Sequence, residues 1–207
     1  MERAWRAAIL IPLVLLAGNA WADTPNDLVT SAIDELSVAL DGKKDALSED
    51  RDELYALIDD ILLPRFDRKY AAQLVLGQHW RAADAAQRER FIDAFYSAML
   101  SKYADGVLEF EEDRVEVLPF RGDATKKRTM VRTMVRLNDG TKVPVNYGLV
   151  RREQGWLMFD VTIEGISYVR NFRAELDAEI RETSLEQVIS RFEAEAGAPA
   201  AAEAAAD

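Results

Sequence analysis

Residues 129–149 read TMVRTMVRLNDGTKVPVNYGL, a stretch in which apolar and polar side chains alternate. This period of two is typical of β-strands that bury one face. The Asp139-Gly140 pair in the middle readily adopts the positive φ angles of tight turns, so the stretch predicts a β-hairpin. The face expected to be buried carries Val131, Thr133, Val135 and Leu137 on the first strand and Val143, Val145, Tyr147 and Leu149 on the second.

Further strands are expected on both sides of this hairpin. Glu153-Gln154-Gly155 is a turn sequence that leads into a strand over residues 156–163, and the acidic stretch 107–119 is also strand-like. Because Pro144 has no N–H group to donate, we expect it at an edge position or a bulge. Together these segments predict an antiparallel sheet of three or four strands.

The remaining sequence has the three- and four-residue spacing of amphipathic helices. Asp84 with Gln87 three residues later is the clearest helix start, because the pair matches a capping box. Helices on both sides of a meander of strands predict an α+β fold in a single domain. The expected helices span residues 25–40, 48–62, 67–77, 84–103, 166–180 and 184–192.

Both ends of the chain are expected to lie outside the folded domain. Residues 1–22 combine a basic start, an apolar run and the small-x-small end Ala20-Trp21-Ala22, which is typical of a signal peptide. Residues 194–207 are mostly Ala and Glu and predict a disordered tail. The domain is therefore expected to span residues 23–193 of an exported protein, which has no cysteine for a disulfide or a lipid anchor.

The chain is acidic, with a formal net charge of −11. Nucleic acids are bound through lysine and arginine, so this charge argues against a nucleic-acid partner. It also argues against adsorption to an anionic bilayer, and any lipid cargo would then be delivered by docking to other proteins. An acidic surface that simply keeps an exported protein in solution is an equal alternative.

The residues that usually carry catalysis are sparse. His79 is the single histidine and there is no cysteine, so no metal site is expected and His79 is best explained as a structural hydrogen-bonding group. The sequence contains neither a Gly-x-Ser-x-Gly elbow nor a glycine-rich phosphate loop. Asp160 and Glu164 are the carboxylates best suited to a catalytic role, although Asp160 equally suits a structural hydrogen-bond acceptor. We therefore expect no enzymatic activity.

Several motifs occur in order along the chain. They are Leu76-Gly77-Gln78-His79-Trp80-Arg81, then Gln87-Arg88 with residues 91–103, Val143-Pro144-Val145-Asn146-Tyr147, residues 156–161, and Glu164-Gly165-Ile166-Ser167 leading to Asn171-Phe172-Arg173. Together they resemble the MlaC family, over about residues 28–192. The family commonly has tyrosine where this chain has Phe172, so no role of that hydroxyl is carried over.

Members of this family are periplasmic phospholipid-binding proteins of the ABC transport system that maintains outer-membrane lipid asymmetry, also described as toluene-tolerance proteins. The resemblance implies a monomeric carrier, without a cofactor, that shuttles phospholipid between an outer-membrane lipoprotein–porin complex and an inner-membrane ABC transporter complex. It also implies a twisted antiparallel sheet of about four strands, similar to the nuclear-transport-factor architecture. Helices would pack across this sheet and leave an apolar cavity for the lipid tails.

The residues expected to line this cavity come from the sheet, from the facing helix and from the rim. They are Val131, Val135, Val143, Val145, Tyr147 and Leu149, with Phe91, Phe95 and Met99 opposite, and Ile163, Ile166 and Val169 near the rim. Arg170 and Arg173 are candidates for contact with the head-group phosphate, because guanidinium groups suit phosphate. For each apolar residue, a place in an ordinary solid core is the alternative.

Two other functions stay open at this point. A small hydrolase or isomerase of the same architecture would use Asp160 or Glu164 as a base in the cavity. A periplasmic chaperone or lipoprotein carrier would need an open apolar face for polypeptide. The strict alternation of the sheet and the facing amphipathic helices favour an enclosed cavity instead.

Overall fold

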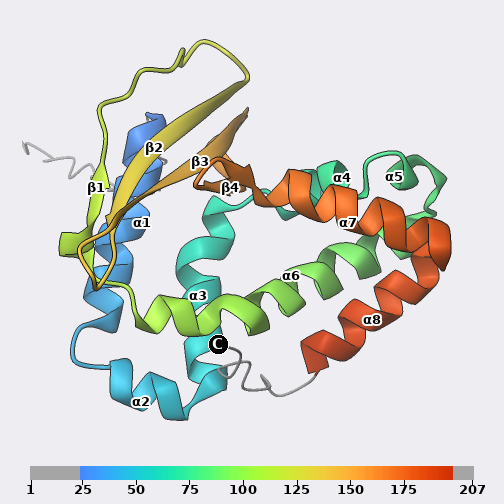
Figure 1. Cartoon of the computed structure of the whole chain (residues 1–207), viewed down its shortest axis with the longest axis horizontal. Coiled ribbons are helices and arrows are strands. Elements are labelled where there is room, and N and C mark those ends of the chain that lie inside the picture. Colours follow the sequence, from blue (N-terminus) through green and yellow to red (C-terminus); the bar gives the residue numbers. More distant parts are fainter. Residues whose placement is uncertain (1–23, 198–207) are drawn as a thin grey trace, which may run out of the picture.

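The computed structural model describes residues 24–197, which form one antiparallel sheet and two groups of helices (Figure 1). The α+β fold in a single domain is confirmed. The predicted signal peptide, residues 1–22, lies outside the described residues. The sheet has the order β1 (Val115–Val117), β2 (Arg128–Arg136), β3 (Lys142–Arg152), β4 (Gly155–Ile163) and β5 (Ile166–Ser167).

The hairpin predicted from the alternating sequence is β2 and β3. Val131 lies opposite Tyr147 and Val135 lies opposite Val143, so these side chains share one face of the sheet. Gly140 in the turn has a φ of +85°, a conformation that glycine adopts at little cost. Residues that alternate between apolar and polar in the sequence therefore point to opposite faces of the sheet.

The position of Pro144 corrects one expectation. β3 is a central strand, with β2 on one side and β4 on the other, so Pro144 does not lie on an edge strand. The pairing with β4 ends at Val145, however, which lies opposite Ile163. Just beyond this pair, the carbonyl of Pro144 accepts a hydrogen bond from the N–H of Glu164 at 3.0 Å. This side of Pro144 faces a turn instead of a strand, so its missing N–H breaks no ladder.

Each of the six predicted helices is present, and their starts follow the capping chemistry of the sequence. Thr24 and Asp84 each form a capping box with the residue three positions later. The helices are α1 (Pro25–Leu40), α2 (Lys44–Glu49), α3 (Arg51–Leu62), α4 (Arg68–Leu76), α5 (His79–Ala82), α6 (Ala85–Leu108), α7 (Tyr168–Glu182) and α8 (Leu185–Gly197), with the 3-10 turns η1 (Leu63–Arg65) and η2 (Glu112–Arg114).

The strand predicted over residues 107–119 is mostly wrong. α6 continues to Leu108, and only β1 is extended. The last turns of α6 are stabilised because Ala104 is buried against α1, α2 and α3 in a cluster with Leu40, Leu47 and Leu54. Tertiary packing here outweighs the local strand-like pattern.

Three other boundaries also differ from expectation. Asp50 instead of Ser48 caps α3, since its carboxylate accepts from the N–H of Glu53 at 3.0 Å. α7 begins only after Ser167, whose hydroxyl caps it, so Ile166 belongs to β5. α8 extends to Gly197, four residues into the predicted tail, and an ion pair between Arg191 and Glu195 at 2.6 Å stabilises this extension.

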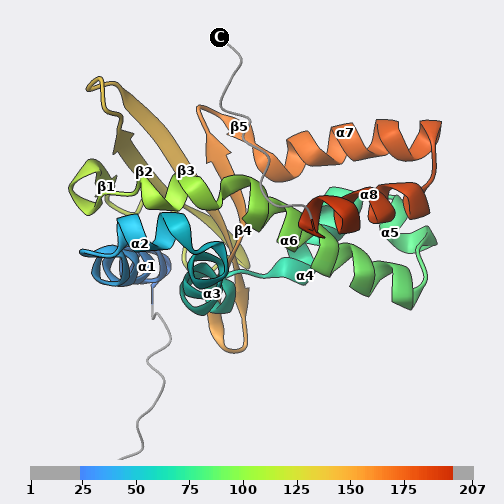
Figure 2. The same cartoon turned by 90° about the horizontal axis from the view of Figure 1, so that it is seen from below.

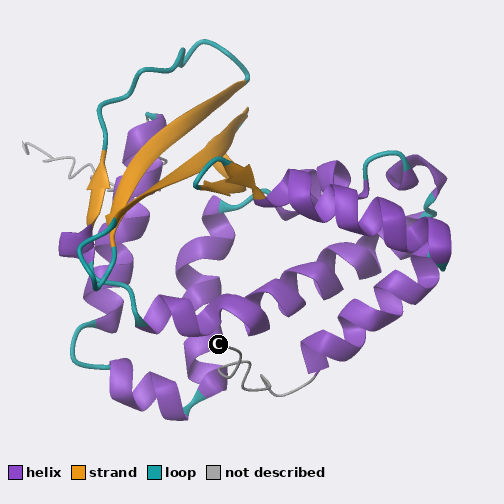
Figure 3. Cartoon of the chain, in the orientation of Figure 1, coloured by secondary structure: helices purple, strands orange, loops and turns teal. Residues whose placement is uncertain are grey.

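α6 connects two halves of the molecule. Figure 1 and Figure 2 show it running from the sheet, near α2 and α3, to a lobe in which α8 lies alongside it. Figure 3 shows the strands gathered in one half and α4, α5, α7 and α8 in the other. We call α4, α5, α7, α8 and the first half of α6 the helical lobe.

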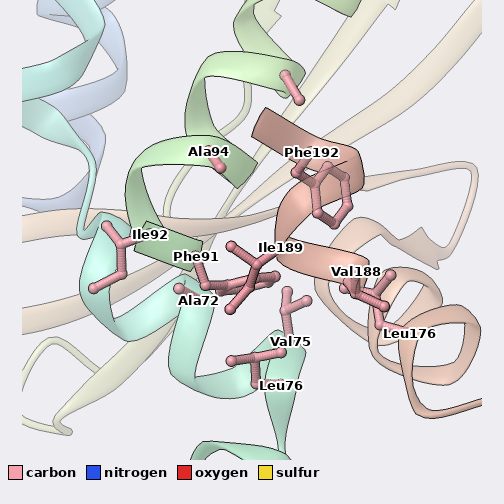
Figure 4. Packing of buried hydrophobic residues seen from close by; sticks show 11 residues of the cluster. Ala72, Val75, Leu76, Phe91, Ile92, Ala94, Leu176, Val188, Ile189 and Phe192 are labelled. Carbon is pink, nitrogen blue, oxygen red and sulfur yellow. The ribbon is translucent and has the colours of Figure 1, made fainter. Parts of the chain in front are cut away.

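Each half has its own solid core. Figure 4 shows side chains of four helices pointing toward one another in the helical lobe, among them Leu76 of α4, Phe91 of α6 and Ile189 of α8. A second cluster lies under the sheet, where Val29 of α1 packs with Val131 and Leu149. The cavity described next lies between these cores, so its walls are backed by packed side chains.

Candidate functional site

An apolar cavity of about 600 Å³ lies between the sheet and helices α1, α3 and α6. This volume falls within the range of roughly 300–1,000 Å³ that is typical of small-molecule pockets. Aliphatic and aromatic side chains form most of its wall. They include Val29, Ala32, Ile33 and Leu36 of α1, Ile58 and Leu62 of α3, Ile92, Phe95, Tyr96, Met99, Leu100, Tyr103 and Ala104 of α6, and Val115, Val135, Tyr147, Met158 and Val161 of the sheet.

The α6 wall is formed by one stripe of the helix. Phe95, Met99 and Tyr103 are spaced by four residues, which places them on the same side. The Phe95 ring also meets Phe172 of α7 and Phe192 of α8 edge to face, each with centroids 5.3 Å apart. Because Phe95 is braced by the helical lobe, this wall keeps its shape without a ligand.

The sheet wall carries few free polar groups. Tyr147, which lies opposite Val161 on β4, is largely buried, and this burial raises the pKa of its hydroxyl. The hydroxyl of Thr133 donates to the carbonyl of Val145 at 2.6 Å, so it is satisfied within the sheet. Apart from Arg136 at the end of β2, the sheet residues that line the cavity are uncharged, so a long apolar ligand can lie against them without stripping water from a charge.

Tyr103 and Leu137 both line the cavity and are 42% and 46% exposed, so the cavity reaches the surface. Leu137 lies beside Asn138, whose side chain accepts a hydrogen bond from Arg114. We call the part of the cavity near Leu137 the mouth, and its polar and charged lining residues are Glu109, Glu111, Arg114, Arg136 and Asn138. The cavity is thus apolar inside and polar at its rim, as an amphiphile requires.

The structure places four of the twelve predicted lining residues in the cavity wall, namely Phe95, Met99, Val135 and Tyr147. Phe91 belongs to the core of the helical lobe, and Val131 and Leu149 belong to the core under the sheet; all three are fully buried. These side chains are covered by neighbouring elements before they can reach the open space. Val143, Val145, Ile163, Ile166 and Val169 also lie outside the cavity wall, and Ile166 is 63% exposed.

The contribution of α1 was missed by sequence reasoning. Val29, Ala32, Ile33 and Leu36 line the cavity, and all are on the apolar stripe that predicts this helix. The stripe indicates that α1 has an apolar face to bury, but it does not indicate which elements cover that face or whether a cavity lies beside it. Its partners, β1, β2 and β4, lie far along the chain.

The two predicted head-group arginines do not lie at the cavity. Arg170 is exposed on α7. The guanidinium of Arg173 lies against Gly77, where an added Cβ would be only 2.7 Å from its Nε. Arg173 thus lies over the C-terminal end of α4 and away from the cavity.

Replacing Gly77 with alanine is expected to lower the free energy of unfolding by about 1–3 kcal/mol. Gly77 has a φ of +53°, and its new Cβ would also collide with Arg173. Gly42→Ala is the matched control, since Gly42 has a φ of +66° but open space around it. Urea denaturation of both variants gives the two losses. Gly77→Ala is expected to lose more, since the ψ of Gly77 is −114°, outside the left-handed region that other residues can adopt, and its Cβ would displace the Arg173 guanidinium. A loss no larger than that of Gly42→Ala would contradict this strain.

The groups considered for catalysis are engaged in structural contacts. The Asp160 carboxylate accepts from the hydroxyl of Ser167 at 2.6 Å and from the N–H of Val169 at 3.0 Å, so it holds the start of α7. Glu164 is exposed in the turn before β5. Neither residue lines the cavity. The Asp160 contacts agree with its predicted structural role.

His79 is also a structural group, as predicted. Its Nε2 lies 2.8 Å from the carboxylate of Asp177 on α7, and Gln78 donates to the same carboxylate at 2.7 Å. The hydrogen bond with His79 is the main reason that the pKa of Asp177 lies below its usual value. Within residues 24–197, no group of three or more His, Cys, Asp or Glu side chains could hold a metal ion. No helix in the same range is long and apolar enough to cross a membrane.

Fold and site together define a class of protein: a small α+β domain built around a hollow that suits a long apolar ligand with a polar end. The chain belongs to the MlaC family, whose sequence model, described as "MlaC protein", matches residues 30–194. The resemblance seen in the ordered motifs is thereby confirmed.

Two curated relatives cover most of the chain. The toluene tolerance protein ttg2D of Pseudomonas putida is 28% identical over 166 residues, which cover 78% of this chain and 77% of that protein. The intermembrane phospholipid transport system binding protein MlaC of Haemophilus influenzae is 21% identical over 189 residues, which cover 89% of this chain and 88% of that protein.

A solved structure has the same fold. It is the phospholipid-binding protein from Ralstonia solanacearum in complex with a phospholipid, with a TM-score of 0.75 and 23% identity. The match covers 84% of this chain and 97% of the Ralstonia chain. The predicted arrangement of helices packed across an antiparallel sheet is confirmed by this likeness.

Proposed function

We propose that this chain is a periplasmic carrier that holds the acyl chains of a phospholipid in the cavity between its sheet and α1, α3 and α6. It shuttles phospholipid between an outer-membrane lipoprotein–porin complex and an inner-membrane ABC transporter complex, and so maintains outer-membrane lipid asymmetry. The observation that carries the proposal is the cavity of about 600 Å³ with an apolar wall and a polar mouth. The name of the Haemophilus relative, an intermembrane phospholipid transport system binding protein, supports a role in phospholipid transport.

The physical need for such a carrier follows from the hydrophobic effect. Exposing a methylene to water costs about 0.8 kcal/mol, so two acyl chains of about 30 carbons cost on the order of 20 kcal/mol. A wall such as that formed by Phe95, Met99 and Val135 offers a similar environment to the bilayer interior. Loading and unloading are then nearly balanced, and docking to a partner complex sets the direction of transfer.

No catalytic group is required for this task. Binding and release change no covalent bond, and the carboxylates considered as bases, Asp160 and Glu164, do not line the cavity. The apolar wall also lines a cavity between the sheet and α1, α3 and α6 instead of forming a flat open face for polypeptide. The carrier therefore fits the site better than either a cavity enzyme or a chaperone.

The test is native mass spectrometry of the mature protein, purified without detergent from cells that export it. We expect a species heavier than the bare chain by the mass of a phospholipid, and phospholipid in the organic extract of the same sample. A protein that carries no phospholipid after purification, and takes none up from phospholipid vesicles, would rule the carrier out.

A further inference from the structure

The mouth of the cavity holds charges of both signs in a defined arrangement. Arg114 of η2 forms an ion pair with Glu111 at 2.7 Å and also donates to the side chain of Asn138 in the hairpin turn. Arg136 at the end of β2 pairs with Asp113 at 3.2 Å. Two guanidinium groups thus lie at the place where the apolar wall ends, one from η2 and one from the sheet.

Carboxylates lie at the same end. Among the residues that line the cavity, Glu109 and Glu111 are the carboxylates, and both belong to the segment that joins α6 to η2. Arg68 also lines the cavity, but it is paired with Asp93 at 3.4 Å and covers the Tyr96 ring at 5.0 Å. Among the described residues that line the cavity, arginines and carboxylates therefore lie together only at the mouth.

The existing ion pairs are easily exchanged. The Arg136 and Asp113 side chains are 51% and 74% exposed, and the Arg114 and Glu111 side chains are 28% and 45% exposed. Ion pairs that solvent reaches contribute little to stability, and of these two pairs the one with Asp113 is the easier to open. A phosphate offers a guanidinium more than one acceptor oxygen, so it can replace a carboxylate partner at small cost. Such a replacement leaves the carboxylate of Glu111 or Asp113 without its cation.

We propose that the mouth is a binding site for a zwitterionic phospholipid head group that carries an ammonium. Arg114 and Arg136 donate hydrogen bonds to the phosphate, and the ammonium donates to Glu111 and Glu109. The inference rests on the proposed carrier function and adds a head-group preference to it. In this exchange each arginine gains a phosphate oxygen and the released Glu111 gains the ammonium, while the carboxylate of Asp113, which is 74% exposed, is left to solvent.

An anionic head group has no ammonium to pair with Glu111. With phosphatidylglycerol, the phosphate can still meet Arg114, but the glycerol brings no cation to Glu111. Its negative charge then adds to the unpaired carboxylates of Glu109 and Glu111, in a chain whose formal charge is already −11. The mouth should therefore favour phosphatidylethanolamine over phosphatidylglycerol with the same acyl chains.

The test loads the delipidated protein from vesicles that contain equal amounts of phosphatidylethanolamine and phosphatidylglycerol with identical acyl chains. The bound ratio is read by native mass spectrometry. We expect the ethanolamine lipid to exceed the glycerol lipid by about threefold to tenfold, the range that weak, partly exposed ion pairs can give. Glu111→Gln is expected to bring the ratio close to one.

A second arm tests the phosphate contact. Diacylglycerol with the same chains replaces phosphatidylglycerol, and the double variant Arg114→Gln/Arg136→Gln is compared with the wild type. The variant is expected to lose the preference for phospholipid over diacylglycerol. Arg170→Gln removes the same kind of charge from an exposed site outside the cavity, and it should leave both ratios unchanged.

The outcomes separate the two proposals. Bound lipid with no head-group preference, or a preference that Glu111→Gln leaves intact, overturns the head-group site but not the carrier. An equal change in Arg170→Gln shows a general effect of net charge and also overturns the site. Failure of the wild type to bind any of these lipids overturns the carrier itself.

Discussion

Replacing Phe91 with alanine is expected to lower the free energy of unfolding by about 3–5 kcal/mol, the range for removing a large aromatic side chain from a core. Phe91 is fully buried in the helical lobe. Its ring stacks on Phe95 with centroids 5.4 Å apart and meets the edge of Phe192 at 6.0 Å. Urea denaturation of the delipidated protein gives the value, since bound lipid would itself add stability.

The Phe91 experiment also decides between two views of this residue. The sequence places it in the cavity wall, whereas the structure places it in solid packing. Ile166→Ala is the control, because Ile166 is 63% exposed and its truncation should change stability by less than about 0.5 kcal/mol. A loss below about 1 kcal/mol for Phe91→Ala would mean that its ring borders open space after all.

Replacing Ala32 with phenylalanine is expected to remove most of the bound phospholipid. Ala32 lies on α1 and lines the cavity, so a phenyl ring there takes up part of the space for the acyl chains. Excluding only three methylenes costs about 2.4 kcal/mol, or roughly fiftyfold in affinity. The lipid-bearing fraction after loading from vesicles, measured by native mass spectrometry, gives the loss.

The stability of the same variant tests whether the space is open. A ring that enters a cavity adds contacts, so the delipidated Ala32→Phe protein should unfold at the same urea concentration as the wild type or at a higher one. In a filled core the same change would cost about 1–3 kcal/mol. Ala178→Phe, at an exposed site of α7, is the matched control and should affect neither binding nor stability. Full lipid binding by Ala32→Phe would contradict the position proposed for the acyl chains.

The alternation of residues 129–149 determined the β-hairpin, because backbone geometry sends successive side chains to opposite faces wherever a strand forms. Capping residues such as Thr24 and Asp84 determined the starts of α1 and α6 through contacts only three residues apart. The ordered motifs indicated the family. The hairpin, the helix caps and the motifs all depend on residues that are close together in the sequence, so the sequence alone is enough to predict them.

The apolar stripe of α6 is a case in which the sequence could not predict the environment of each residue. Phe91, Phe95 and Met99 have the same spacing and the same apolar character. Even so, the first is buried in the helical lobe and the other two line the cavity. α6 passes from one half of the molecule to the other, so equivalent positions on one stripe meet different partners. The contact of Phe95 with Phe192 joins residues nearly a hundred positions apart.

Whether an apolar side chain fills a core or borders a hollow was therefore decided by the tertiary structure alone, and so was the choice of arginines at the mouth. Arg170 and Arg173 occupy a motif of the family, yet Arg114 and Arg136 reach the rim because η2 and the end of β2 come together there. Hydrophobic burial is not directional, so the sequence specifies only that an apolar face must be covered. Whether that face meets a filled core or a cavity depends on the packing of elements that lie far apart in the sequence.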